Sequence, residues 1–147
     1  MTRWIVDASV AVKWFVPEPL SERAAGLLRA AQDGRVNLLA PDLIVAEFGS
    51  ALVKKVAARE LGASDAGNIL GTFLALPVEI MASGPLARAA LLIAAAAGCT
   101  FYDAVYLAAA QSAGGRLATA DKELVRLVSR TPLADLVIPV RDLPSAP

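Results

Sequence analysis

The segment Trp4-Ile5-Val6-Asp7-Ala8-Ser9 begins a pattern that recurs along the chain, in which a short apolar run ends at a polar turn before a helical stretch. Residues 4–6 show no alternation of apolar and polar side chains, which is typical of a strand buried on both faces. Further strands are predicted over residues 36–40, 78–81, 116–119 and 136–138. Helices are predicted over residues 21–32, 42–60, 64–75, 85–97, 100–113 and 122–128. This alternation predicts an α/β fold with a central parallel sheet covered by helices on both faces.

Composition narrows the class of protein. A chain of 147 residues, 56% of them hydrophobic, suits one domain over residues 1–147 and leaves apolar surface for a partner. Fourteen basic residues balance fourteen acidic ones, so any contact with nucleic acid must be local. The absence of histidine excludes His-based zinc sites and Ser-His-Asp triads, and the single Cys99 excludes a disulfide framework.

Apolar segments are too short for targeting or membrane insertion. The apolar run before Asp7 spans only the three residues 4–6, so a signal peptide is not expected. The alanine-rich stretch between Arg88 and Asp103 has fourteen uncharged residues, whereas a spanning helix needs about 20. We expect this stretch to contain a buried helix, and we expect the protein to be cytoplasmic with no membrane partner.

Two acidic residues are predicted at the same edge of the sheet. Asp7 follows the first strand directly, and Asp121 lies two residues beyond the strand 116–119. The carboxyl ends of parallel strands meet at one edge, where ligands of such sheets bind. Taken alone, each residue is more simply interpreted as a helix N-cap. Asp42 is likewise predicted to cap the helix over residues 42–60.

Two further acids fall on helices. Asp103 lies three residues after Thr100, the spacing of a capping box. Glu47 is the only charged residue between positions 43 and 53, and a helical wheel places it with Lys54 opposite the main apolar face. Taken alone, Glu47 is more simply interpreted as part of a solvated polar face.

A convergence of these acids would require a cation. Two carboxylates about 4 Å apart repel by about 4 kcal/mol at an effective dielectric constant of about 20. Oxygen ligands without histidine or thiolates select hard ions such as Mg²⁺ or Mn²⁺, which commonly work beside phosphates. The pattern therefore indicates phosphoryl chemistry.

Four segments resemble, in order and spacing, the acidic motifs of the PIN-domain ribonucleases. They are Val6-Asp7-Ala8-Ser9, Ala46-Glu47, Phe101-Tyr102-Asp103-Ala104-Val105-Tyr106 and Leu117-Ala118-Thr119-Ala120-Asp121. The resemblance covers roughly residues 3–140 and is strongest to the VapC-like toxins of toxin-antitoxin systems. It implies a PIN-like three-layer α/β/α sandwich, endoribonuclease activity dependent on Mg²⁺ or Mn²⁺, a cognate antitoxin protein and a homodimer.

The resemblance also implies roles for individual residues. Asp7 and Asp103 would be the principal metal ligands, and Glu47 and Asp121 would complete the catalytic acidic pocket. Hydroxyl groups would support this pocket through hydrogen bonds, from Ser9 and Thr119. Three lysines at its rim are predicted to contact RNA phosphates, namely Lys13, Lys54 and Lys122. One departure is Ser50, where many relatives have an asparagine.

Two other functions remain open at this level. A phosphoaspartate-type phosphatase or receiver domain would use Asp7 as nucleophile, but the phosphatase motif has a second Asp where this chain has Ser9. A non-catalytic PIN-fold protein-binding module would keep the fold and bind its partner without turnover. Metal-dependent RNA cleavage distinguishes the enzyme from the binding module.

Overall fold

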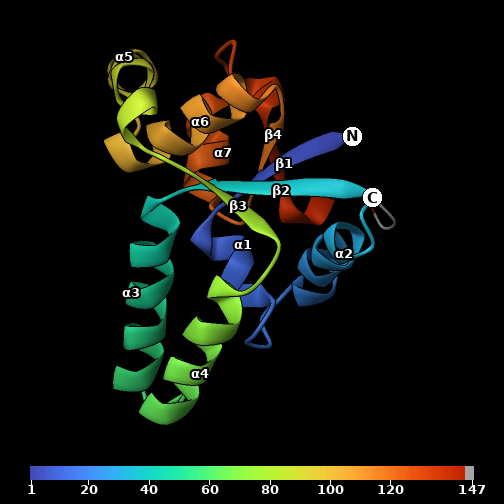
Figure 1. Cartoon of the computed structure of the whole chain (residues 1–147). Coiled ribbons are helices and arrows are strands. Elements are labelled where there is room, and N and C mark those ends of the chain that lie inside the picture. Colours follow the sequence, from blue (N-terminus) through green and yellow to red (C-terminus); the bar gives the residue numbers. More distant parts are fainter. Residues whose placement is uncertain (145–147) are drawn as a thin grey trace.

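The fold is built on one five-stranded parallel sheet (Figure 1). A computed structural model describes residues 1–144. The strands are β1 (Thr2–Val6), β2 (Val36–Pro41), β3 (Val78–Met81), β4 (Arg116–Thr119) and β5 (Val137–Pro139). Their order across the sheet is β3-β2-β1-β4-β5. All five predicted strands are present, and their boundaries differ by at most two residues from those predicted.

The strand order creates a crevice site at the centre of the sheet. β1 pairs with β2 on one side and with β4 on the other, so that Ile5 lies between Leu39 and Leu117. The chain first adds strands on the β2 side and then crosses to the β4 side. In open parallel sheets this switch point, beyond the carboxyl ends of the strands, is where ligands bind. The residues that follow β1 and β4 therefore share the expected binding crevice.

Helices cover both faces of the sheet, which confirms the predicted three-layer α/β/α sandwich (Figure 1). On one face α6 (Phe101–Ala113) packs on β1, β2 and β4, with α5 (Ala87–Ala97) outside it. Helices α1 (Ala8–Lys13) and α2 (Ser21–Gln32) lie on the other face, and α7 (Lys122–Val128) packs on β5. Helices α3 (Leu43–Ala57) and α4 (Ala63–Leu74) extend away from the sheet, and 3₁₀ turns cover Gly84–Leu86, Ala134–Leu136 and Val140–Asp142.

The prediction of a buried alanine-rich helix was wrong for α5. Only Ala90 of this helix is fully buried, and Leu91 and Leu92 are 62% and 66% exposed. The inner position belongs to α6, in which every residue from Ala104 to Ala110 is buried. Both helices are rich in small apolar residues, so composition alone did not distinguish the inner helix from the outer one.

No single helix in residues 1–144 has the length and apolar character needed to cross a membrane. The segments Gly84–Ala97 and Phe101–Ala113 meet that test only when joined, and they are bent by 117° at their junction.

Glycines make the connection from α6 to β4 tight. Gly114 ends α6 with φ +64°, a backbone conformation that disfavours other residues. A Cβ atom at Gly115 would collide with the carbonyl oxygen of Arg3 in β1. This close approach brings β4 into register beside β1, and it thereby helps to place their carboxyl ends together.

Asp42 does not cap α3 with its side chain, contrary to the prediction. Its backbone is already helical, with φ −59° and ψ −24°, and its side chain makes no capping hydrogen bond to α3. The carboxylate instead accepts hydrogen bonds from the backbone N–H of Ser83 at 3.1 Å and from the Ser83 hydroxyl. Asp42 therefore ties the start of α3 to the segment after β3.

Candidate functional site

Asp7 is buried at the carboxyl end of β1, with 9% of its surface exposed. It is the N-cap of α1, and its Oδ1 accepts hydrogen bonds from the backbone N–H of Val10 at 3.2 Å and from Ser9 Oγ at 2.5 Å. Its Oδ2 accepts a hydrogen bond from the Thr119 hydroxyl. A carboxylate has about four lone-pair positions, so one remains available on Oδ2.

The two hydroxyl groups also join Asp7 to the loop after β4. Ser9 Oγ accepts a hydrogen bond from the backbone N–H of Ala120 at 2.9 Å. Thr119 Oγ1 accepts one from the backbone N–H of Asp121 at 3.0 Å. The hydroxyl hydrogen bonds expected of Ser9 and Thr119 are thus present, and they couple the ends of β1 and β4 across the switch point.

The capping interpretation is also correct for the start of α6 and α7. Oδ1 of Asp121 accepts hydrogen bonds from the N–H groups of Glu123 at 3.0 Å and Leu124 at 3.1 Å. At α6, Thr100 Oγ1 accepts a hydrogen bond from the N–H of Asp103 at 3.0 Å. Capping therefore anchors Asp121 through one carboxylate oxygen and Asp103 through its backbone, and it leaves carboxylate oxygens available at both residues.

Tyr106 is a site residue to which sequence analysis assigned no role. It lies on α6 one turn after Asp103, is 3% exposed, and donates a hydrogen bond from its hydroxyl to Glu47 Oε1 at 2.7 Å. This bond fixes Glu47 of α3 against α6. A buried tyrosine hydroxyl needs a polar partner, which was the only signal in the sequence.

The four acids influence one another electrostatically. Burial raises the pKa of Asp7 from 3.8 to about 6 despite its hydrogen bonds, and the charge of Glu47 adds to this rise. Burial, followed by the charge of Asp103, raises the pKa of Glu47. Burial, followed by the charge of Asp121, raises the pKa of Asp103. The acids therefore form a continuous series in which each repels its neighbour.

The ligand chemistry of this series suits a hard divalent cation. In residues 1–144 none of the four carboxylates forms an ion pair with a lysine or arginine, so their mutual repulsion is not offset by a side chain. The same residues contain no group of three Asp, Glu, His or Cys side chains arranged to hold a metal. The oxygen donors are of the type that a hard divalent ion prefers, but their present spacing does not form a metal site. The acids would have to move closer together to share one ion.

Grooves flank the crevice on two sides. One, of about 580 Å³, is lined by Ser9 and Glu47 together with Lys13 and Lys54. The other, of about 520 Å³, is lined by Asp121 and Lys122 and again by Lys13. The three predicted RNA-binding lysines therefore all line these grooves. Contact with RNA remains a prediction.

Lys13 has protein partners that the sequence did not indicate. Its ammonium donates to the carbonyl oxygen of Pro19 at 2.8 Å and pairs with Glu18 Oε1 at 3.3 Å. Its side chain is only 10% exposed. Lys13 is therefore held inside the groove, whereas Lys54 is exposed.

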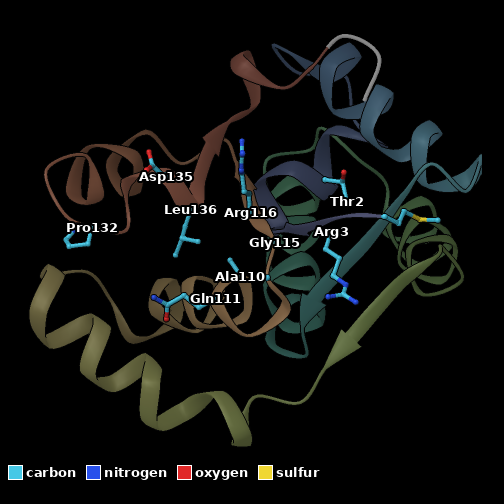
Figure 2. Close-up of a pocket in the computed structure, with 11 residues that line it drawn as sticks. Thr2, Arg3, Ala110, Gln111, Gly115, Arg116, Pro132, Asp135 and Leu136 are labelled. Carbon is cyan, nitrogen blue, oxygen red and sulfur yellow. The ribbon is translucent and has the colours of Figure 1, made fainter.

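A further pocket of about 580 Å³ lies at the opposite edge of the sheet, by the amino ends of β1 and β4 (Figure 2). Thr2, Arg3 and Arg116 line it, and Asp135 is its only acidic residue. It lacks the converging carboxylates, and the amino edge is not where parallel sheets bind ligands. The acidic crevice is therefore the better candidate site.

The chain is similar to known proteins of one family. The family model of the PIN domain matches residues 4–129. Ribonuclease VapC3 from Pyrobaculum aerophilum is 35% identical over 124 residues, which cover 82% of this chain and 90% of that protein.

Solved structures share the fold. The crystal structure of PAE2754 from Pyrobaculum aerophilum superposes with a TM-score of 0.68 at 26% identity, covering 95% of this chain and 92% of that one. VapBC2 from Rickettsia felis, crystallised with a DNA fragment from its promoter, gives a TM-score of 0.67 at 12% identity. That match covers 94% of this chain and 98% of the solved chain, and at this identity it supports the fold alone. Family model, relative and fold agree that this chain belongs to the PIN-domain family.

Proposed function

We propose that this protein is an endoribonuclease dependent on Mg²⁺ or Mn²⁺ and the toxin of a toxin-antitoxin pair. The observation that carries the proposal is the series Asp7, Glu47, Asp103 and Asp121 at the switch point, with no lysine or arginine paired to it in residues 1–144. The 35% identity to a ribonuclease VapC supports the same activity.

Each acid has a proposed role. Asp7 and Asp103 would hold the principal ion, with Asp7 using the lone pair left on Oδ2. Glu47 and Asp121 would complete the pocket. A bound divalent ion would supply Lewis-acid stabilisation of charge on the scissile phosphate.

The remaining residues orient these acids. Ser9 and Thr119 hold the Asp7 carboxylate in one orientation through hydrogen bonds from both sides. Tyr106 takes one lone pair of Glu47 Oε1, which leaves Oε2 as the less engaged oxygen for an ion or for the attacking water. Burial raises the pKa of Glu47, which brings this carboxylate closer to the range of a general base.

The proposed partners follow from the same reading. A cognate antitoxin would bind this chain and block the crevice, as the resemblance to VapC-like toxins and the 35% identity to a ribonuclease VapC imply. Large exposed apolar side chains on α3, α5 and α6, including Val53, Leu91 and Tyr102, support a homodimer. Light scattering on the purified chain tests the dimer. The proposed substrate and antitoxin agree with a cytoplasmic location.

An RNA cleavage assay with single-residue variants tests the activity. We expect cleavage of single-stranded RNA with Mn²⁺ or Mg²⁺, loss of cleavage in EDTA, and a severe loss in Asp7→Asn and Asp103→Asn. The matched control is Asp135→Asn, an exposed carboxylate at the opposite edge of the sheet. Partner capture without any turnover would favour the non-catalytic binding module, and phosphatase activity without RNA cleavage would favour the phosphoaspartate alternative.

A further inference from the structure

Glu18 lies between two lysines that come from different helices. Its Oε1 pairs with Lys13 at the end of α1 at 3.3 Å, and its Oε2 pairs with Lys55 of α3 at 3.2 Å. The lysine side chains are only 10% and 17% exposed. Two ammonium groups are thus ordered around one carboxylate, an arrangement that binds a single anion.

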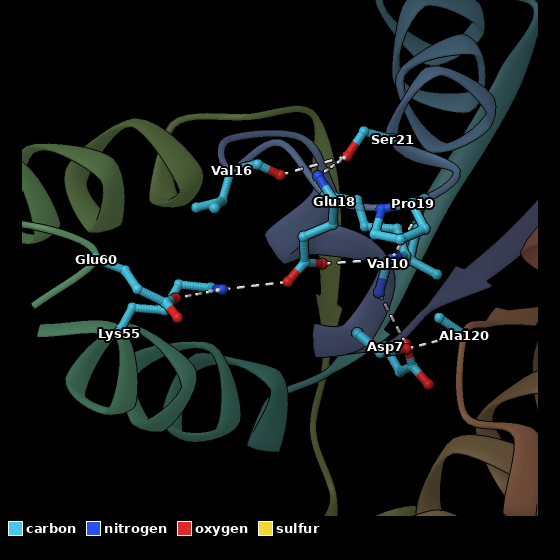
Figure 3. Close-up of polar contacts among 11 residues, drawn as sticks. Asp7, Val10, Val16, Glu18, Pro19, Ser21, Lys55, Glu60 and Ala120 are labelled. Carbon is cyan, nitrogen blue, oxygen red and sulfur yellow. Dashed lines mark hydrogen bonds and ion pairs between the residues drawn. The ribbon is translucent and has the colours of Figure 1, made fainter. Parts of the chain in front are cut away.

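This lysine pair lies in the groove that leads to the acidic crevice. The groove of about 580 Å³ is lined by Lys13, Glu18 and Lys55 and also by Ser9 and Glu47. Figure 3 shows Glu18 extending from the loop between α1 and α2 toward Lys55, with Asp7 and Ala120 nearby below α1. An RNA strand whose scissile phosphate lies at the acids would therefore pass the lysine pair.

We propose that Lys13 and Lys55 form a binding site for a backbone phosphate of the RNA, and that the Glu18 carboxylate covers this site until RNA displaces it. The inference rests on the proposed ribonuclease function and adds a position where the strand is held away from the cleaved bond. Neither Glu18 nor Lys55 belongs to the acidic motifs.

The exchange of Glu18 for phosphate conserves charge and needs little rearrangement of the lysines. A phosphodiester carries one negative charge, as Glu18 does, and each ammonium has three donors. Lys13 keeps its bond to the Pro19 carbonyl oxygen at 2.8 Å, and Lys55 keeps Glu60 at 3.6 Å. Both cations therefore stay in position while one donor of each changes partner.

Glu18 is placed so that it can leave. It lies in the loop between α1 and α2, flanked by Pro17 and Pro19, and its side chain is 28% exposed. Movement of this side chain breaks no hydrogen bond within a helix or strand. Its negative charge at the groove repels RNA while it remains there, so the same residue lowers the affinity for RNA.

RNA binding by Glu18→Gln tests the proposal. Fluorescence anisotropy with a short single-stranded RNA of mixed sequence, in EDTA to prevent cleavage, should give a Kd roughly three- to tenfold lower than that of the wild type. Because RNA displaces Glu18 in the wild type as well, both proteins make the same number of phosphate contacts, and the slope of log K against log salt should stay nearly unchanged. Adding Lys55→Gln to Glu18→Gln should abolish the gain in affinity and flatten the slope by about 0.7, because one phosphate contact is lost.

Glu22→Gln is the matched control, because it removes the same charge from an exposed residue of α2 that pairs with Arg29 at 3.1 Å. Binding by Glu18→Gln that is no tighter than binding by Glu22→Gln would overturn the proposal. Circular dichroism checks that each variant is folded. If Glu18→Gln fails to fold, Lys55→Gln alone decides, because it must weaken binding and flatten the salt slope.

The test of the phosphate site can fail independently of the test of the proposed ribonuclease function. Metal-dependent cleavage together with unchanged binding in these variants would reject the phosphate site alone. Tighter binding by Glu18→Gln without any cleavage would reject the nuclease and retain the phosphate site.

Discussion

Replacement of Asp7 by asparagine should remove a pH-dependent loss of stability. Burial raises the pKa of the folded-state carboxyl from 3.8 to about 6, so the folded protein binds this proton more tightly than the unfolded chain. The contribution of Asp7 to the free energy of unfolding is therefore fully present below about pH 3.8. It decreases as the pH rises through 6 and is lost above that value. A pKa difference of this size corresponds to about 3 kcal/mol, about half of which develops between pH 5 and pH 8.

Urea unfolding in EDTA measures this difference directly. Trp4 is 5% exposed, so its fluorescence reports loss of the core. Because the chain has no histidine, few other side chains titrate between pH 5 and pH 8. The free energy of unfolding of the wild type should fall by about 1.5 kcal/mol more than that of Asp7→Asn across this range. Asp135→Asn, which removes an exposed carboxylate, should follow the wild type.

Repeating the unfolding experiment with Mn²⁺ in place of EDTA tests metal binding at Asp7. At pH 8, Mn²⁺ should raise the stability of the wild type and leave that of Asp7→Asn nearly unchanged, because a ligand stabilises the state that binds it. Parallel pH curves for wild type and Asp7→Asn would refute the reasoning about burial. Equal stabilisation of both proteins by Mn²⁺ would show that the ion does not bind at Asp7.

Three further outcomes are expected. Asp42→Ala should cost about 1 kcal/mol of stability, because its hydrogen bonds to Ser83 are lost, and should leave RNA cleavage intact. Glu47→Gln should melt like the wild type but cleave RNA poorly. The reverse pattern in melting and cleavage assays would mean that Asp42, and not Glu47, is the functional acid. Tyr106→Phe should fold and lower kcat about tenfold with little change in KM, because the variant loses only the hydrogen bond that orients Glu47. An unchanged kcat would show that the hydrogen bond from Tyr106 to Glu47 is purely structural. The cleavage products should carry a 5′-phosphate and a 3′-hydroxyl, because the chain has no histidine pair to activate the RNA 2′-hydroxyl. Detection by mass spectrometry of a 2′,3′-cyclic phosphate formed in EDTA would contradict this prediction.

Local patterns in the sequence were sufficient for the fold class and for the positions of the acids. The five strands and the order of the helices after α1 follow from runs of a few residues, whereas the short helix α1 was not predicted. Asp7 and Asp121 were placed at one edge because each follows a strand. Capping by Thr100 was predictable for the same reason. Hydrophobic period, turn residues and caps act over four or fewer residues along the chain, so they are readable without the third dimension.

Only the tertiary structure decided which distant residues meet. Tyr106 and Glu47 are 59 positions apart, and Glu18 reaches Lys55 across 37. Asp42 was wrongly predicted as a side-chain cap because Ser83, a partner 41 positions away, offers its carboxylate two donors. Only the tertiary structure also decided that α5 is exposed and α6 is buried. The two helices have similar compositions, so the sequence did not indicate which of them packs directly on the sheet. These outcomes depend on distances between separate segments, which are set by packing of the whole chain and have no signal in any one segment.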